Sequence, residues 1–112
     1  MIMIINIAGE YTKTPGARYI ADGEFSGEDF RNTILEPRYK ECKENNKKLT
    51  INFDGGYGYG TSFLEESFGG LVRKGYSSEE LLKNIELISE EEPELIDKVV
   101  KYIKEAVYEK KN

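Results

Sequence analysis

Two apolar segments, at the start and in the middle of the chain, have the pattern of buried strands. Residues 1–7 form a nearly continuous apolar run of strand length, which is typical of a strand buried on both faces. In residues 49–53, by contrast, Leu49, Ile51 and Phe53 alternate with polar residues. This spacing of two places three apolar side chains on one face of an extended segment, so we predict another strand there.

Two other segments have weaker strand patterns. Residues 17–20 follow the turn-forming pair Pro15-Gly16 and could return as a strand. Residues 85–88 carry three apolar side chains, but the segment is so short that it could equally be the end of the preceding helix. Together the four segments predict a single sheet of about four strands.

The first predicted helix begins near Ser26, which has the spacing of an N-cap paired with Asp29. Pro37 should end or kink this helix, because proline lacks an amide hydrogen and disfavours helical conformation in the residue before it. Residues 39–48 are mostly polar, and we expect them to form a frayed turn. Cys42, in this polar stretch, would then be an incidental surface thiol.

A second predicted helix follows the glycine-rich stretch after the central strand. Ser62 and Glu65 have the spacing of a capping box, in which each side chain bonds an unpaired amide of the first turn. Gly75 is suited to end the helix, and Gly69 and Gly70 inside it would let it approach the sheet, or alternatively a partner, closely. Its buried stripe is predicted to contain the apolar residues at helical spacing, Leu64, Phe68, Leu71 and Val72.

Two further helices complete the predicted order. Ser77 and Glu80 indicate another capping box and a short helix, and Pro93 after three glutamates is typical of the first turn of a longer one. Strands thus alternate with helices, which favours an α/β fold: one mixed, partly parallel sheet with three or four helices packed on it. No linker or repeat divides the sequence, so residues 1–112 are predicted to form one domain.

Composition and charge exclude several classes of function. The formal net charge of the 112 residues is −5, which disfavours a nucleic-acid partner because phosphate binding needs a basic surface. The absence of histidine excludes His-based triads and His metal sites, and we expect no metal and no cofactor. The single cysteine suits a reducing compartment, and no apolar run approaches the ~20 residues of a membrane span. We therefore expect a cytoplasmic protein.

The glycine-rich stretch contains the candidate binding residues. Its backbone amides could cradle an anion at the start of the following helix, although the lysine of a phosphate-binding P-loop is absent. Alternatively, the glycines only allow a tight connection between strand and helix. Two tyrosines in the turn favour contact with a partner, since each offers a flat apolar face and a hydroxyl. The candidate surface comprises Asp54, Gly56, Tyr57, Gly58, Tyr59, Gly60, Thr61, Ser62, Glu65, Glu66 and Arg73.

Two hydroxyl residues at the predicted helix start have alternative roles. A phosphate on Ser62 or Thr61 would be favoured by the helix dipole and would place negative charge on the surface. Alternatively, Ser62 is only a helix cap, and removing it would cost ~1 kcal/mol. Next to them, Glu65 and Glu66 would offer negative charge to a basic partner.

The chain resembles a known family over roughly residues 4–108. The resemblance is carried by two segments, PGARYIADGEFSGEDFR and INFDGGYGYGTSFLEESFGGLVRKG. These look like the STAS-like family of unknown function found in bacteria and phages, which is in turn similar to the STAS domain of anti-sigma factor antagonists. The resemblance implies a sheet with helices packed on it, and a regulatory rather than a catalytic role.

The resemblance also implies a type of partner. In STAS antagonists, a serine at the start of the helix after the central strand is phosphorylated by a kinase of the histidine-kinase-like ATPase class, and the unphosphorylated form binds that kinase. By position, Ser62 or Thr61 matches this serine, although Gly60 precedes them here where antagonists carry Asp-Ser. Family members often lie beside genes for such ATPases, so an ATPase of this class is the implied partner.

Two hypotheses about function follow. The first is a non-enzymatic STAS-like module for regulatory protein–protein interaction, switched by phosphorylation on serine or threonine. The second is a sensor that binds a nucleotide or another phosphate ligand through the amides of residues 56–62. A hydrolase is a third hypothesis, which the composition disfavours because no histidine is available as a base. The identity of the partner, the use of phosphorylation and the formation of a homodimer stay open.

Overall fold

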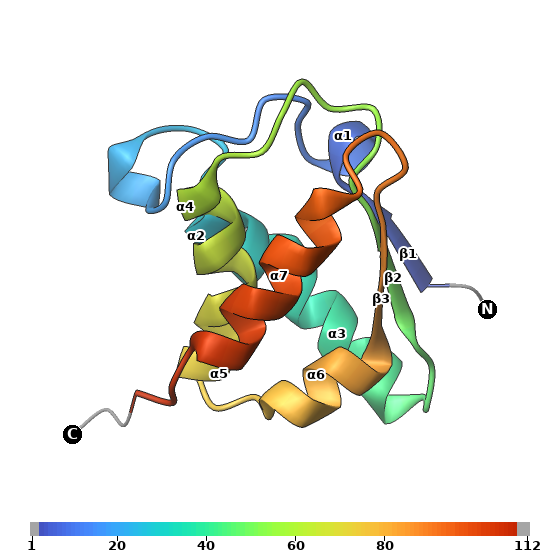
Figure 1. Cartoon of the computed structure of the whole chain (residues 1–112). Helices are drawn as coiled ribbons and strands as arrows, with labels where there is room; N and C mark the ends of the chain where they lie inside the picture. The colour runs from blue at the N-terminus through green and yellow to red at the C-terminus, as the bar shows by residue number, and fades with distance from the viewer. Residues whose placement is uncertain (1–2, 110–112) are drawn as a thin grey trace.

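The computed structural model describes residues 3–109, and its sheet has three parallel strands (Figure 1). The strands, of which β2 lies in the middle, are β1 (Met3–Asn6), β2 (Leu49–Asn52) and β3 (Ile85–Ile88). They are paired in register over four residues. The carboxyl ends of all three strands therefore meet at one edge of the sheet, where α/β folds usually place their functional loops.

This sheet differs from the predicted one of about four strands in mixed orientation. Residues 85–88 do form a strand, whereas residues 17–19 belong to a loop and Ile20 begins the 3₁₀ turn η1 (Ile20–Asp22). The backbone of this loop forms hydrogen bonds with the start of the next helix and not with a neighbouring strand. The carbonyls of residues 17 and 18 accept the first two amides of that helix, at distances of 2.9 and 3.0 Å.

Five helical stretches occur in the described residues, and two of them contain a π turn. The first of these two, which we call the first long helix, consists of α2 (Gly27–Phe30), the π turn η2 (Arg31–Leu35) and α3 (Glu36–Glu44). The second, which we call the second long helix, consists of α4 (Thr61–Leu64), the π turn η3 (Glu65–Gly69) and α5 (Gly70–Arg73). The others are α6 (Ser78–Asn84), α7 (Glu94–Glu105) and the single turn α1 (Ile7–Glu10), which the sequence pattern did not predict. Within residues 3–109, none of these helices has both the length and the apolar character needed to cross a membrane.

The longer helices cover one face of the sheet and leave the other face open (Figure 1). The covered face carries apolar side chains that form the core with the helices, among them Ile5, Leu49 and Ile51. On the open face, Ile4 and Ile88 are exposed next to polar side chains. Parallel sheets are usually covered on both faces, so this two-layer arrangement is a distinctive feature of the molecule.

The predicted stripe and end of the second long helix are confirmed. Leu64, Phe68 and Leu71 are fully buried, and Val72 is nearly so. Gly75 adopts φ +115°, a conformation that favours glycine. The amides of Gly75 and of the next residue donate to the carbonyls of Val72 and Leu71, as in a Schellman motif.

The first long helix was predicted to end or kink at Pro37, but it does not end there and continues to Glu44. The wider π turn directly before it gives the proline ring room that an α-helical turn lacks. Packing also favours the continuation, because Tyr39 and Cys42 are buried in the core. The prediction of a frayed turn is therefore wrong for residues 39–44, although residues 45 and 46 do form a turn, and the prediction of a surface thiol is wrong.

Candidate functional site

A loop of residues 53–60 connects β2 to α4 at the carboxyl edge of the sheet and passes over the top of the molecule in Figure 1. Its base is bonded to the connection between β3 and α7. The Asp54 carboxylate accepts the amides of Glu90 and Glu91 at 3.1 and 3.0 Å. The amide of Gly55 donates in turn to the Glu91 carboxylate at 2.7 Å. Asp54, predicted as a contact residue, thus anchors the loop.

The tip of this loop presents Tyr57. Its backbone amide donates to the carbonyl of Lys13 at 2.8 Å, which ties the tip to the segment after α1. Its side chain is 81% exposed. Gly56 and Gly58 flank it, and Gly58 adopts φ +142°, which a residue with a side chain rarely takes. An exposed aromatic ring on a backbone that is held in place is well suited to contact a partner.

Tyr59, the second tyrosine of the loop, faces inward. Its hydroxyl donates to the carbonyl of Phe53 at 2.8 Å, and the two rings pack edge-on with their centroids 5.3 Å apart. Burial and the nearby carboxylate of Asp54 raise the pKa of the Tyr59 hydroxyl, so it stays protonated at neutral pH. Tyr59 therefore closes the loop onto the core, and Tyr57 is the tyrosine of this loop that a partner could reach.

The helix after the loop begins at Thr61, with Gly60 as its N-cap. The predicted capping box of Ser62 and Glu65 is wrong for two reasons. Ser62 already lies inside the first turn, and the Glu65 carboxylate bonds two arginines instead of a backbone amide. Thr61 is exposed and Ser62 is half-buried, so Thr61 has the more accessible hydroxyl of the two predicted phosphorylation sites.

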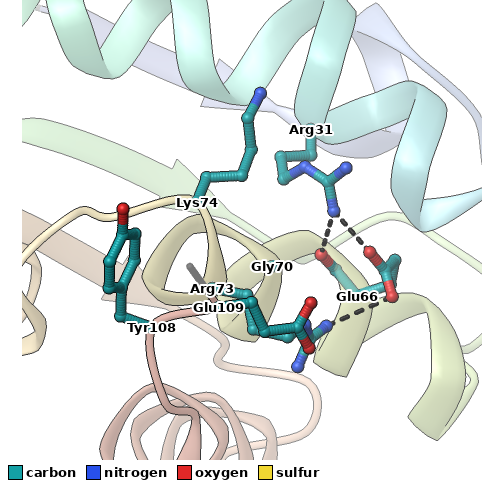
Figure 2. A pocket seen from close by; sticks show the side chains of 7 residues that line it. All are labelled: Arg31, Glu66, Gly70, Arg73, Lys74, Tyr108 and Glu109. Atoms are coloured by element: carbon teal, nitrogen blue, oxygen red, sulfur yellow. Dashed lines mark hydrogen bonds and ion pairs between the residues drawn. The ribbon is translucent and has the colours of Figure 1, made fainter. Parts of the chain in front are cut away.

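Glu65 and Glu66 bind arginines from three parts of the chain. Glu65 accepts hydrogen bonds from Arg18 at 2.6 Å and from Arg73 at 2.7 Å. Glu66 is buried and accepts one from Arg31 at 2.5 Å and one from Arg73 at 3.2 Å (Figure 2). Sequence reasoning did not identify Arg18 or Arg31, because these partners lie 47 and 35 residues from their carboxylates and no local spacing reveals them.

This network accounts for charges that were predicted to face a partner. Burial raises the pKa of Glu65, but the hydrogen bonds from Arg73 and Arg18 outweigh it and hold that pKa below its usual value. Glu65 is thus ionised at neutral pH, with its charge balanced inside the molecule. Arg73 is held by the same carboxylates. The expectation that Glu65 and Glu66 offer charge to a basic partner has no support from this geometry.

Gly69 and Gly70 make room for the network. A Cβ atom at Gly70 would collide with the Arg31 guanidinium, and one at Gly69 would collide with the Glu65 carboxylate. The same Arg31 nitrogen also donates to the backbone carbonyl of Glu66 at 2.9 Å. These glycines therefore let polar side chains come close to the helix. The prediction was instead that they let the helix approach the sheet.

A pocket of about 440 Å³ lies beside the network, where the end of α5 meets the chain after α7 (Figure 2). Its lining includes Arg31, Arg73 and Lys74. Each of these cations already bonds a carboxylate within the molecule. The pocket therefore offers little uncompensated positive charge to an anion.

Comparison with known proteins identifies a family. The family model described as "STAS-like domain of unknown function (DUF4325)" matches residues 26–95, more than half of the chain. The matched span contains both long helices, β2, β3 and the loop between β2 and α4. Neither the curated proteins nor the solved structures gave a match. The chain therefore belongs to the family of STAS-like domains of unknown function.

Proposed function

We propose that this chain is a non-enzymatic regulatory module that binds a protein partner through residues 56–62, which we call the contact corner. The observation that carries the proposal is the 81% exposure of Tyr57 on a loop that is bonded at its base and at its tip. A contact residue whose backbone is held in place before binding loses less conformational freedom when the partner docks. Tyrosine is also among the residues that contribute most to binding energy at protein interfaces.

The proposed partner is an ATPase of the histidine-kinase-like class, as the resemblance to STAS antagonists implies. Phosphorylation of Thr61 or Ser62 would add negative charge within the first turn of α4. The helix dipole favours such a charge, so the phosphate would change the contact corner without unfolding the helix. The exposed Thr61 is the preferred acceptor in this proposal.

Substitution of Tyr57 tests the contact corner. We expect Tyr57→Ala to lower the affinity for a histidine-kinase-like ATPase that co-purifies with the wild-type chain by about tenfold or more, measured by calorimetry. The melting temperature should stay unchanged, because the ring is exposed. Tyr108→Ala is the matched control, since Tyr108 is also exposed but lies beside Lys74, at the far end of the α4–α5 helix. Equal affinities of the wild type and Tyr57→Ala would refute the proposed surface.

A sensor for a phosphate ligand is the second candidate, since the first turn of α4 has no side-chain cap and keeps amides for other acceptors. The surroundings disfavour it. The amides of Gly55 and Tyr57 already bond Glu91 and Lys13. The carboxylates of Asp54 and Glu91 lie at the base of the loop, so a phosphate would meet negative charge there.

Thermal unfolding in the presence of nucleotides separates the two candidates. We expect ATP, ADP, GTP and inorganic phosphate to leave the melting temperature unchanged. A ligand present at 100 times its Kd would stabilise the protein by ~2.7 kcal/mol, which such a measurement detects readily. A clear increase with one of these ligands would favour the sensor over the protein-binding module.

A further inference from the structure

A shallow groove lies at the start of α2 and shares no lining residue with the contact corner. It has a volume of about 670 Å³ and is lined by residues 20–26 together with Tyr11 and Asp29. In Figure 1 most of this lining belongs to the light-blue loop that leads into α2. We call it the α2 groove.

The floor of the α2 groove is apolar and exposed. Eight large apolar or aromatic side chains of the described residues are exposed, and three of these, Tyr19, Ile20 and Phe25, lie within seven residues of the chain. Ile20 and Phe25 line the groove, and the ring of Tyr11 packs edge-on against Phe25 with centroids 5.6 Å apart. Because exposed apolar surface is unfavourable in water, such a cluster favours contact with a partner.

The groove is held in shape without a ligand. The Tyr11 hydroxyl donates to the Asp29 carboxylate at 2.7 Å, and the amide of Ile20 donates to the Glu28 carboxylate at 2.9 Å. Phe25 adopts φ +56°, which bulky residues rarely take and which persists only where the surrounding contacts impose it. A groove that is already formed loses little conformational freedom when a segment binds in it.

The rim of the α2 groove is acidic. Its described lining includes the carboxylates of Asp22, Glu24 and Asp29 and neither a lysine nor an arginine. The chain as a whole also carries a formal charge of −5. An acidic rim around an apolar floor attracts a partner that combines positive charge with apolar side chains, and it repels an anionic surface such as an acidic membrane.

We propose that the α2 groove binds a basic, amphipathic peptide segment of a protein partner. In this arrangement a leucine or aromatic side chain of the segment packs on Ile20 and Phe25. Lysine or arginine side chains on either side of it face Asp22 and Glu24. The proposal does not depend on the contact corner, because the two surfaces have no residue in common.

Selection of a random phage-displayed peptide library against the full chain tests this proposal. We expect the enriched peptides to combine lysine or arginine with leucine or aromatic residues, and synthetic copies of them to bind in calorimetry. Ile20→Ser should weaken that binding by about tenfold or more. Val107→Ser is the matched control at another exposed apolar side chain and should have no effect. Both variants should fold, since both side chains are exposed.

Charge reversal gives a second, independent measurement. Glu24→Lys should weaken binding of the basic peptides and improve binding of copies in which glutamate replaces their lysines and arginines. Tyr57→Ala should leave the peptide affinity unchanged, which separates this proposal from the contact corner. The proposal is overturned by a selection without enrichment, by enrichment of acidic or uncharged peptides, or by undiminished binding to Ile20→Ser. Binding of phosphatidylserine vesicles that Ile20→Ser abolishes would also overturn it.

Discussion

Glu66 is the most deeply buried of the charged residues that were predicted to contact a partner. Its side chain is buried, and its carboxylate bonds Arg31 and Arg73 while its backbone carbonyl also accepts a hydrogen bond from Arg31. A buried carboxylate is costly unless its charge is paired and its oxygens are bonded. The pair of Glu66 with Arg31 therefore permits the close contact between the π turns η2 and η3.

Replacement of Glu66 by glutamine keeps the shape of the side chain and removes its charge. Because Arg31 is only 7% exposed, its own charge would then be buried without its closest counter-ion. We expect Glu66→Gln to lower the free energy of unfolding by ~3 kcal/mol, measured by urea denaturation. Glu80→Gln is the control and should change it far less, since the ion pair of Glu80 with Lys43 is about half exposed. Losses of equal size would contradict a stabilising role for the buried pair.

At the scale of elements, the starts of the two long helices differ although their sequences look alike. Ser26 is fully buried, and its Oγ accepts the amide of Asp29 at 3.0 Å, as predicted. Ser62 has a glutamate at the same spacing, but the chain already enters the helix at Thr61. The position at which the preceding loop enters a helix thus decides which serine can cap it.

The two serines should therefore respond differently to alanine. We expect Ser26→Ala to lower the free energy of unfolding by ~1 kcal/mol or more, because a buried cap is lost. Ser62→Ala should change it by less than ~0.5 kcal/mol, because no capping bond is removed. Urea denaturation of both variants provides the measurement. A larger loss for Ser62→Ala would show that its hydroxyl supports the fold after all.

At the scale of the whole molecule, hydrogen bonds to carboxylates tie together segments that are far apart in the chain. Glu36 in α3 accepts hydrogen bonds from Lys74 and Tyr76, after α5, and Glu65 accepts one from Arg18 in the loop before η1. Burial raises the pKa of Glu36, but the hydrogen bonds from Lys74 and Tyr76 outweigh it and lower that pKa, as the arginines do for Glu65. Both carboxylates therefore stabilise the folded state in their ionised form.

These pKa shifts predict sensitivity to acid. A carboxylate with a lowered pKa in the folded state binds fewer protons there than in the unfolded chain. Its contribution to stability is therefore present above the ordinary glutamate pKa of about 4.3 and is lost as the pH falls through the folded pKa. We expect the urea midpoint to be steady between about pH 6 and 7 and to fall below about pH 4.5. In the double variant Glu36→Gln/Glu65→Gln the fall should be shallower, and an unchanged slope would contradict this explanation.

Much of the fold could be predicted, because helix ends and buried stripes depend on neighbours within a few residues. The stripe from Leu64 to Val72 and the end at Gly75 follow from such local spacing and are confirmed. The strand predicted for residues 17–20 failed because the start of α2 takes up the backbone groups that a sheet would need. Cys42 was placed on the surface because its neighbours in sequence are polar, whereas the helix turns it into the core.

The sequence by itself determined the family, the alternation of strands with helices, and the position of the glycine-rich loop between β2 and α4. The family follows from the match over residues 26–95. The alternation and the loop position follow from spacings of two and 3.6 residues and from the turn preference of glycine, which act over short stretches of chain. Only the tertiary structure decided that Tyr57 faces outward, that Tyr59 faces inward and that Glu66 is already paired. The pairing depends on a contact between residues 35 positions apart, and a contact of that kind leaves no periodic trace in the order of the amino acids.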